Sequence, residues 1–278
     1  MPQRGISFAS PGRHGLRKPD TAAVILKNLD FFDISNIGLK RARNEDSYLS
    51  LSFPTVQAGD KQGGYLFAVA DGIGGNGCGD LASRMTCQEL KAFFNAPWID
   101  LVPERSEKRI DRLFHSIDRK LRRHAVQNPA CTHMGTTLSV LVLFENFGVM
   151  AHVGDSRIYR LREARLVQLT TDHTFVQDMI AEGDLTPESA KTHPFRNMLT
   201  RAVGTQETLE EIQTRILDIA AGDRFLLSSD GLHNMVSDLQ IASTLKGGID
   251  PRDSAEHLLA AALEKGGNDN VTIIVVHL

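Results

Sequence analysis

The 278-residue chain lacks several features that would quickly assign it to a broad class of protein. It has no apolar stretch long enough for a membrane span, and its N-terminus has no apolar segment of signal-peptide length. It also lacks an excess of basic residues, since the net charge is −3 and the pI about 6.4. We therefore expect a globular protein that binds neither membrane nor nucleic acid.

Cysteine is scarce as well. The three cysteines, Cys78, Cys87 and Cys131, are odd in number and include no Cys-x-x-Cys pair. This predicts neither a disulfide framework nor a zinc knuckle, and it suits a reducing, cytoplasmic location. Cys78 lies in a glycine-rich loop, where a small packing residue is favoured over a redox role.

We interpret residues 1–28 as a flexible N-terminal tail, because their apolar runs are short and arginines are interspersed. No internal repeat or low-complexity linker follows. Residues 29–278 are therefore expected to form a single domain, which is a normal length for a two-sheet unit.

Hydrophobic periodicity predicts helices in pairs between groups of strands. We expect strands at 31–35, 48–51, 65–70 and 271–276, several strands within 136–169, and another before Asp230; helices at 79–95 and 104–127, a mixed segment at 174–192, and a last helix beginning at Asp250-Pro251. A turn is expected at 59–64. Because helices do not follow every strand, the pattern favours an α+β fold of antiparallel sheets with helices packed outside.

What the chain does have is acidic residues at turns beside apolar runs, five times over. These motifs are Asn44-Glu45-Asp46, Asp71-Gly72-Ile73-Gly74-Gly75, Gly154-Asp155-Ser156-Arg157, Ser228-Ser229-Asp230-Gly231 and Gly266-Gly267-Asn268-Asp269-Asn270. Carboxylates at strand ends, with glycines that let the backbone approach closely, provide the oxygen ligands that a hard divalent cation prefers. They can act together only if the fold gathers them.

In this order, and with Gly38-x-x-Arg41 and Gly135-Thr136-Thr137 beside them, these motifs resemble those of the metal-dependent serine/threonine protein phosphatases of the PP2C family, bacterial type. The resemblance runs from about Ser35 to Val276. It implies a four-layer α-β-β-α sandwich of two antiparallel sheets, with two Mn²⁺ or Mg²⁺ ions at one edge and often a third.

The resemblance also implies residue roles. Asp71 would bridge the two ions, with the Gly72 carbonyl oxygen on one of them and Asp230 and Asp269 on the other. Glu45 and Asp46 would act through water, Asp155 would join Asp230 at the third ion, and Arg41 would bind the phosphate. The catalytic residues would then be Arg41, Asp71 and Asp230.

Simpler interpretations stay open at each position. Asp71 and Asp230 precede glycine and could only shape turns, as could Asp269. Asp155 could merely pair with Arg157, and Asp46 could cap a local turn. Arg41 could be a surface arginine. We interpret Asp172, Asp218 and Asp223 as structural.

The proton donor for the leaving group is missing from its usual places. Family members carry a histidine where this chain has Ile73 or, in some bacterial members, Asn76, so water on the metal would have to supply the proton. His173 and His193 lie in a segment, about 171–203, that resembles the bacterial flap beside the active site; a histidine there is more often structural than catalytic. Arg196 and Arg201 in this flap either favour acidic phosphopeptides or only solvate a loop.

The sequence therefore predicts a monomeric phosphatase of phosphoserine and phosphothreonine in proteins, which opposes a bacterial serine/threonine kinase and uses metal-activated water. Two alternatives remain: a catalytically weak pseudophosphatase that binds partners, and a phosphatase of small molecules with the same centre.

Overall fold

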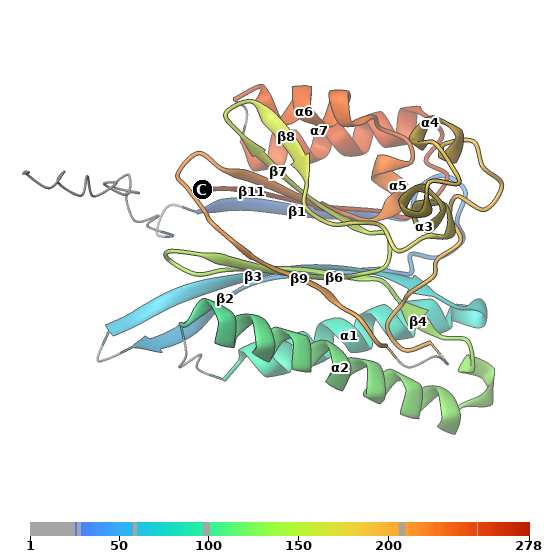
Figure 1. Ribbon diagram of the computed structural model, residues 1–278, viewed down its shortest axis with the longest axis horizontal. Helices are drawn as coiled ribbons and strands as arrows, with labels where there is room; N and C mark the ends of the chain where they lie inside the picture. The colour runs from blue at the N-terminus through green and yellow to red at the C-terminus, as the bar shows by residue number, and fades with distance from the viewer. Residues whose placement is uncertain (1–25, 27–28, 58–59, 97–100, 206–208, 249) are drawn as a thin grey trace, which may run out of the picture.

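The computed structural model describes residue 26 and residues 29–57, 60–96, 101–205, 209–248 and 250–278. Two antiparallel sheets stack face to face, and helices cover both outer faces (Figure 1). The expected four-layer α-β-β-α sandwich is thus confirmed.

The first sheet has the strand order β1-β11-β10-β7-β8. Its strands are β1 (Asp30–Asn36), β7 (Arg157–Arg162), β8 (Arg165–Gln168), β10 (Arg224–Ser228) and β11 (Val271–His277). The C-terminal strand β11 lies inside the sheet, between the first strand and β10. The motifs before β7, after β10 and before β11 therefore meet at one end of this sheet.

The second sheet has the order β2-β3-β5-β6-β9, and the short β4 pairs with the end of β3. Its strands are β2 (Asp46–Gln57), β3 (Asp60–Ile73), β4 (Gly135–Thr136), β5 (Leu138–Leu143), β6 (Gly148–Val153) and β9 (Gln213–Leu217). β2 and β3 form a long hairpin in which Asp46 is opposite Asp71. The first two acidic motifs are therefore direct neighbours across the hairpin.

Successive side chains of a strand point to opposite faces of its sheet. The two sheets therefore contribute to three apolar layers, one between the sheets and one beneath each outer layer of helices. On β3, Phe67 and Val69 point between the sheets, whereas Leu66 and Ala68 face the helices of the second sheet. On β11, Ile274 packs between the sheets, and its neighbours face the other helical layer. All these side chains are fully buried, so both sheets are held rigidly beneath the acidic edge.

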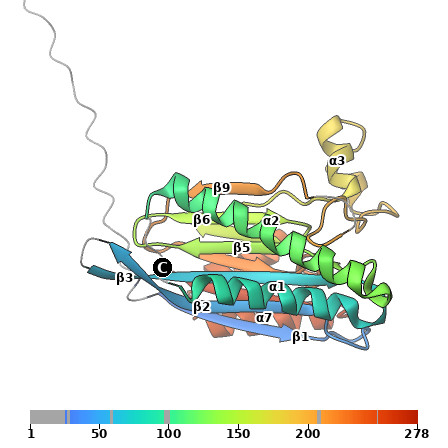
Figure 2. The same cartoon turned by 90° about the horizontal axis from the view of Figure 1, so that it is seen from below.

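The helices cover the two outer faces and form the projecting flap. The second sheet is covered by α1 (Cys78–Phe94) and α2 (Pro103–Gln127); the first by α5 (Asp230–His233), α6 (Asp238–Lys246) and α7 (Pro251–Glu264); the flap contains α3 (Phe175–Glu182) and α4 (Pro187–Ala190). Figure 2 shows α3 standing away from the body of the sandwich. The helix start predicted at Asp250 is confirmed, because its side chain accepts a hydrogen bond from the Asp253 N–H at 2.8 Å.

The structure corrects the cysteine prediction. Cys78, at the start of α1, forms a disulfide with Cys131, and only Cys87 is a free, buried thiol. The pair was missed because the two residues are 53 positions apart and no local spacing marks them. The bond joins the loop that follows Asp71 to the loop that precedes β4.

Two further expectations change. The turn expected at 59–64 is largely strand, because β3 begins at Asp60 and pairs back to Gln57. Most of the predicted tail lies outside the described residues, but Leu26 within it is buried between the sheets. No helix among the described residues has the length and apolar character of a membrane span.

Candidate metal centre

The Asp46 carboxylate is anchored by two hydroxyl groups from the other sheet. Ser229 Oγ donates to Asp46 Oδ2 at 2.7 Å, and Thr272 Oγ1 donates to the same oxygen at 2.6 Å. Asp46 is only 8% exposed, and its Oδ1 has no hydrogen-bond partner. Asp46 therefore does not cap a local turn but joins the two sheets at the acidic edge.

Asp71 is held through its backbone. Its N–H donates to Thr137 Oγ1 at 2.9 Å, and its carbonyl oxygen accepts from the Thr137 N–H at 2.8 Å. The next residue, Gly72, donates its N–H to the Glu45 carbonyl oxygen at 3.1 Å. A Cβ at Gly72 would lie 2.2 Å from the Gly79 carbonyl oxygen, so only glycine fits there. The Asp71 side chain lies among its acidic neighbours, since the charges of Asp46 and Asp230 act on it.

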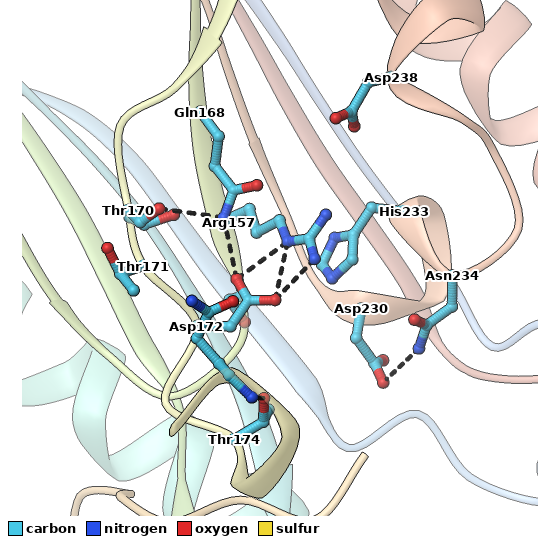
Figure 3. A network of polar contacts seen from close by, with 12 residues as sticks. Arg157, Gln168, Thr170, Thr171, Asp172, Thr174, Asp230, His233, Asn234 and Asp238 are labelled. Atoms are coloured by element: carbon cyan, nitrogen blue, oxygen red, sulfur yellow. Dashed lines mark hydrogen bonds and ion pairs between the residues drawn. The ribbon is translucent and has the colours of Figure 1, made fainter. Parts of the chain in front are cut away.

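Asp230 opens α5 and is buried beside β10. Asn234, one turn later, donates to Asp230 Oδ2 at 3.0 Å, while Asp230 Oδ1 has no partner (Figure 3). A Cβ on Gly231 would lie 2.0 Å from the Asn270 carbonyl oxygen, so this glycine lets the last two acidic motifs touch.

Asp155 does not pair with Arg157. Instead, Arg157 makes a two-pronged ion pair with Asp172, its Nη2 lying 2.6 Å from Asp172 Oδ2 (Figure 3). Arg157 also donates a hydrogen bond to the Tyr159 hydroxyl group. Asp155 is 8% exposed at the turn before β7. The simple pairing that could have accounted for Asp155 is therefore absent, and its carboxylate is available to the centre.

Arg41 and Asp269 lie at the open side of the site. Arg41 Nη2 donates to Asp269 Oδ2 at 2.6 Å, and both side chains are partly exposed. Asn270 fixes this corner: its Oδ1 accepts from the Glu45 N–H at 2.8 Å, and its Nδ2 donates to the Arg43 carbonyl oxygen. Glu45 is thereby brought to the same edge and stays partly exposed.

The pKa values show that these groups share one space. Burial raises the pKa of Asp71 well above its usual value, and the charges of Asp46, Asp230, Asp155 and Asp269 raise it further. The pKa of Asp230 is raised for the same two reasons. Burial is also the main cause that raises the pKa of Asp46 to about 6 and of Asp155 to about 7. Carboxylates that repel one another in a buried site need a cation to be ionised together.

Whether the residues fit metal ions depends on two observations. The unpartnered, buried Oδ1 atoms of Asp46 and Asp230 favour a cation, because a buried polar atom rarely goes unsatisfied. Against this, no set of three or more His, Cys, Asp or Glu side chains in the described part of the chain is arranged to hold a metal ion. Arg41 accounts for part of this, since it holds Asp269. The donors thus fit a hydrated Mg²⁺-like ion, which keeps several waters, better than an ion enclosed by side chains.

The flap histidines are structural in their contacts. His173 is buried, and its Nδ1 accepts a hydrogen bond from the Gly154 N–H at 3.1 Å, which fixes the loop before Asp155. Burial lowers the pKa of His173 to about 4, so the ring is neutral. His193 accepts from the Phe195 N–H within the flap. Neither ring is positioned here as a proton donor.

The carboxylates interpreted as structural do form ion pairs with arginines. Asp172 pairs with Arg157, Asp223 with Arg162, and Asp218 with both Arg162 and Arg160. The motifs and their flanks include Thr137, Ser229, Asn270 and Thr272, but sequence reasoning did not predict that these polar residues support the carboxylates. The signal was available for Thr272, a polar residue within the apolar run of β11.

Comparisons with known proteins agree with this arrangement. The family described as "Protein phosphatase 2C" matches residues 42–265. The protein phosphatase PhpP of Streptococcus pneumoniae is 35% identical over 246 residues, which cover 88% of this chain and 96% of PhpP.

Solved structures give the same result. The serine/threonine phosphatase Stp1 from Staphylococcus aureus superposes with a TM-score of 0.80 at 32% identity, covering 90% of this chain and 95% of that one. The catalytic domain of the serine/threonine protein phosphatase PstP, in complex with two manganese ions, gives 0.75 at 34% identity and covers 90% and 97%. The chain therefore belongs to the protein phosphatase 2C family, among the bacterial serine/threonine protein phosphatases of that type.

Proposed function

We propose that this enzyme hydrolyses phosphoserine and phosphothreonine in proteins at the acidic edge between the two sheets. The observation that carries the proposal is the convergence of Asp46, Asp71, Asp155, Asp230 and Asp269, since the charges of the other four raise the pKa of Asp71. Five separate segments of the chain bring carboxylates to one place, and Arg41 pairs with one of them, Asp269; the repulsion among the others costs stability unless cations are bound.

We propose that Asp71, the Gly72 carbonyl oxygen, Asp230 and Asp269 hold two Mn²⁺ or Mg²⁺ ions, with Glu45 and Asp46 acting through water and Asp155 contributing to a third ion. Such ions, when bound, activate a water molecule for in-line attack on phosphorus and neutralise the phosphoryl oxygens. The orphaned oxygens of Asp46 and Asp230 support this set.

Arg41 is proposed as the phosphate-binding residue. Its hydrogen bond with Asp269 raises the pKa of Arg41, and the charges of Asp71 and Asp230 raise it further. The guanidinium group therefore lies at the edge of the acidic site. Its planar fork can bind two phosphate oxygens. To do so, it must release Asp269.

The wider setting is also part of the proposal. The substrates would be phosphoproteins produced by a cognate serine/threonine kinase, and the enzyme would act as a monomer without binding nucleic acid or membrane. A cytoplasmic location fits a kinase that needs ATP. A disulfide such as Cys78–Cys131 is rare in a reducing compartment such as the cytoplasm. Measuring whether this pair is oxidised or reduced inside cells therefore tests the proposed location directly.

The test is hydrolysis of p-nitrophenyl phosphate and of a phosphothreonine peptide, first with Mn²⁺ and then with EDTA. We expect turnover of both substrates that EDTA abolishes. Manganese binding without turnover would favour the pseudophosphatase, and turnover of nucleotides or sugar phosphates in preference to peptides would favour the small-molecule phosphatase.

A further inference from the structure

A cleft is lined by the residue that follows the Asp71-Gly72 pair and by residues at the end of the flap. Its inner part, with a volume of about 550 Å³, is lined by Ile73, His133, Leu199 and Arg201 among others. Ile73 follows Gly72 directly. The cleft is therefore in contact with the residue that directly follows the proposed metal ligands Asp71 and Gly72 in the chain.

The cleft continues outward without a break. A second part of about 430 Å³ shares Arg201 and its neighbours with the first and ends at Leu209, Glu210 and Glu211. Because they share four lining residues, the two parts form one trough; its described lining includes the apolar Ile73 and Leu199 in one part and the acidic Glu210 and Glu211 in the other.

The wall of this trough is tied to the metal-binding strand. Ile73 pairs with Gly135 of β4, and the Thr136 N–H donates to the Val203 carbonyl oxygen at 2.9 Å, with the reverse bond also 2.9 Å. The backbone that carries Arg201 is thus connected through β4 to the strand of Asp71. The wall of the trough therefore has a fixed position relative to Asp71.

Charge decides which chain fits. Arg201 lies 3.5 Å from Glu211, and these side chains are 42% and 80% exposed. Such a solvated pair is weak, but it neutralises the arginine and leaves Glu210 as a net negative charge. This runs against the idea that Arg201 selects acidic peptides.

We propose that the trough binds the polypeptide next to the phosphorylated residue and selects substrates with an apolar side chain near the phosphothreonine and a basic side chain further along. The inference rests on the proposed protein phosphatase function. Ile73 and Leu199 contact the apolar side chain, and Glu210 and Glu211 attract the basic one.

The experiment compares two phosphothreonine peptides that differ only by arginine or glutamate two to five positions from the phosphothreonine, placed on either side in turn. For one placement we expect kcat/KM of the arginine peptide to be higher by about fivefold, the upper range for an exposed ion pair. The double variant E210Q/E211Q should abolish this ratio and leave turnover of p-nitrophenyl phosphate unchanged.

Two further variants sharpen the test. R201Q should increase the ratio, because it removes the cation that neutralises Glu211. The control E256Q/E264Q, which alters exposed carboxylates on α7, changes net charge equally and should leave the ratio unchanged. Equal kcat/KM for both peptides at every placement, or a ratio that persists in E210Q/E211Q, would overturn the proposal that the trough selects substrates. Absence of all turnover with Mn²⁺ would instead overturn the proposed phosphatase activity.

Discussion

The acidic centre should make the metal-free protein less stable as pH rises, and Asp46 allows the size of this effect to be worked out. Burial is the main cause that raises the pKa of Asp46 from 3.8 to about 6. Because the folded state binds this proton more tightly than the unfolded state, the stabilisation is complete below pH 3.8 and is lost as pH rises through 6. At about 1.4 kcal/mol for each pKa unit, the loss is about 3 kcal/mol.

The assay is urea unfolding in EDTA, followed by circular dichroism, for wild type and Asp46→Asn. An asparagine carbonyl oxygen can still accept the hydrogen bonds from Ser229 and Thr272. The variant should therefore gain about 2.4 kcal/mol relative to wild type between pH 4 and pH 7, because part of the loss has already occurred at pH 4. The buried histidines His152 and His173 have lowered pKa values, so their contribution to stability rises with pH. This contribution is the same in both proteins and cancels when the stability of wild type is subtracted from that of the variant.

Glu264→Gln is the matched control, since Glu264 is an exposed carboxylate on α7, outside the centre. Its difference from wild type should not change with pH over this range. With saturating Mn²⁺, wild type should instead become the more stable protein at pH 7. A difference between Asp46→Asn and wild type that is flat from pH 4 to pH 7 in EDTA would refute the idea of an uncompensated acidic centre.

Three other perturbations have defined outcomes. Gly231→Ala places a Cβ 2.0 Å from a backbone carbonyl oxygen before β11, and urea unfolding should show a loss of about 3 kcal/mol, whereas Gly63→Ala, with open space, should be near neutral. The Cys78–Cys131 disulfide links positions 53 residues apart and stabilises the fold by up to about 4 kcal/mol, because it lowers the entropy of the unfolded chain. Dithiothreitol, which reduces this bond, should therefore lower the Tm of wild type and leave the Tm of Cys78→Ser unchanged. Arg41→Lys loses the two-pronged geometry, so the KM for p-nitrophenyl phosphate should rise about tenfold while kcat changes less; an unchanged KM would remove Arg41 from phosphate binding.

Much of the fold could be predicted from the sequence because its signals are local. Periodicity indicated α1 and α2, and the Asp250-Pro251 pair marked the start of α7. The short helices α5 and α6 were not predicted. For α5, the reason is that a four-residue helix has too few positions to show a period. The predicted turn at 59–64 was wrong because hairpin pairing continues through its glycines.

The site was predictable in residue type but not in contacts. Acidic motifs could be found by inspection, but the hydroxyl groups on Asp46 come from segments about two hundred positions away, and only the fold brings them together. The same distance problem hid the Cys78–Cys131 bond. The roles of Asp71, Asp230 and Asp269 as metal ligands stay predictions.

The central claim is tested most directly by a crystal structure of the protein soaked with manganese, using the anomalous signal to locate the ions. We predict two manganese peaks between Asp71, Asp230 and Asp269, with Arg41 displaced from Asp269. An Arg41–Asp269 pair that remains in place, with no anomalous peak beside Asp71, would contradict the account.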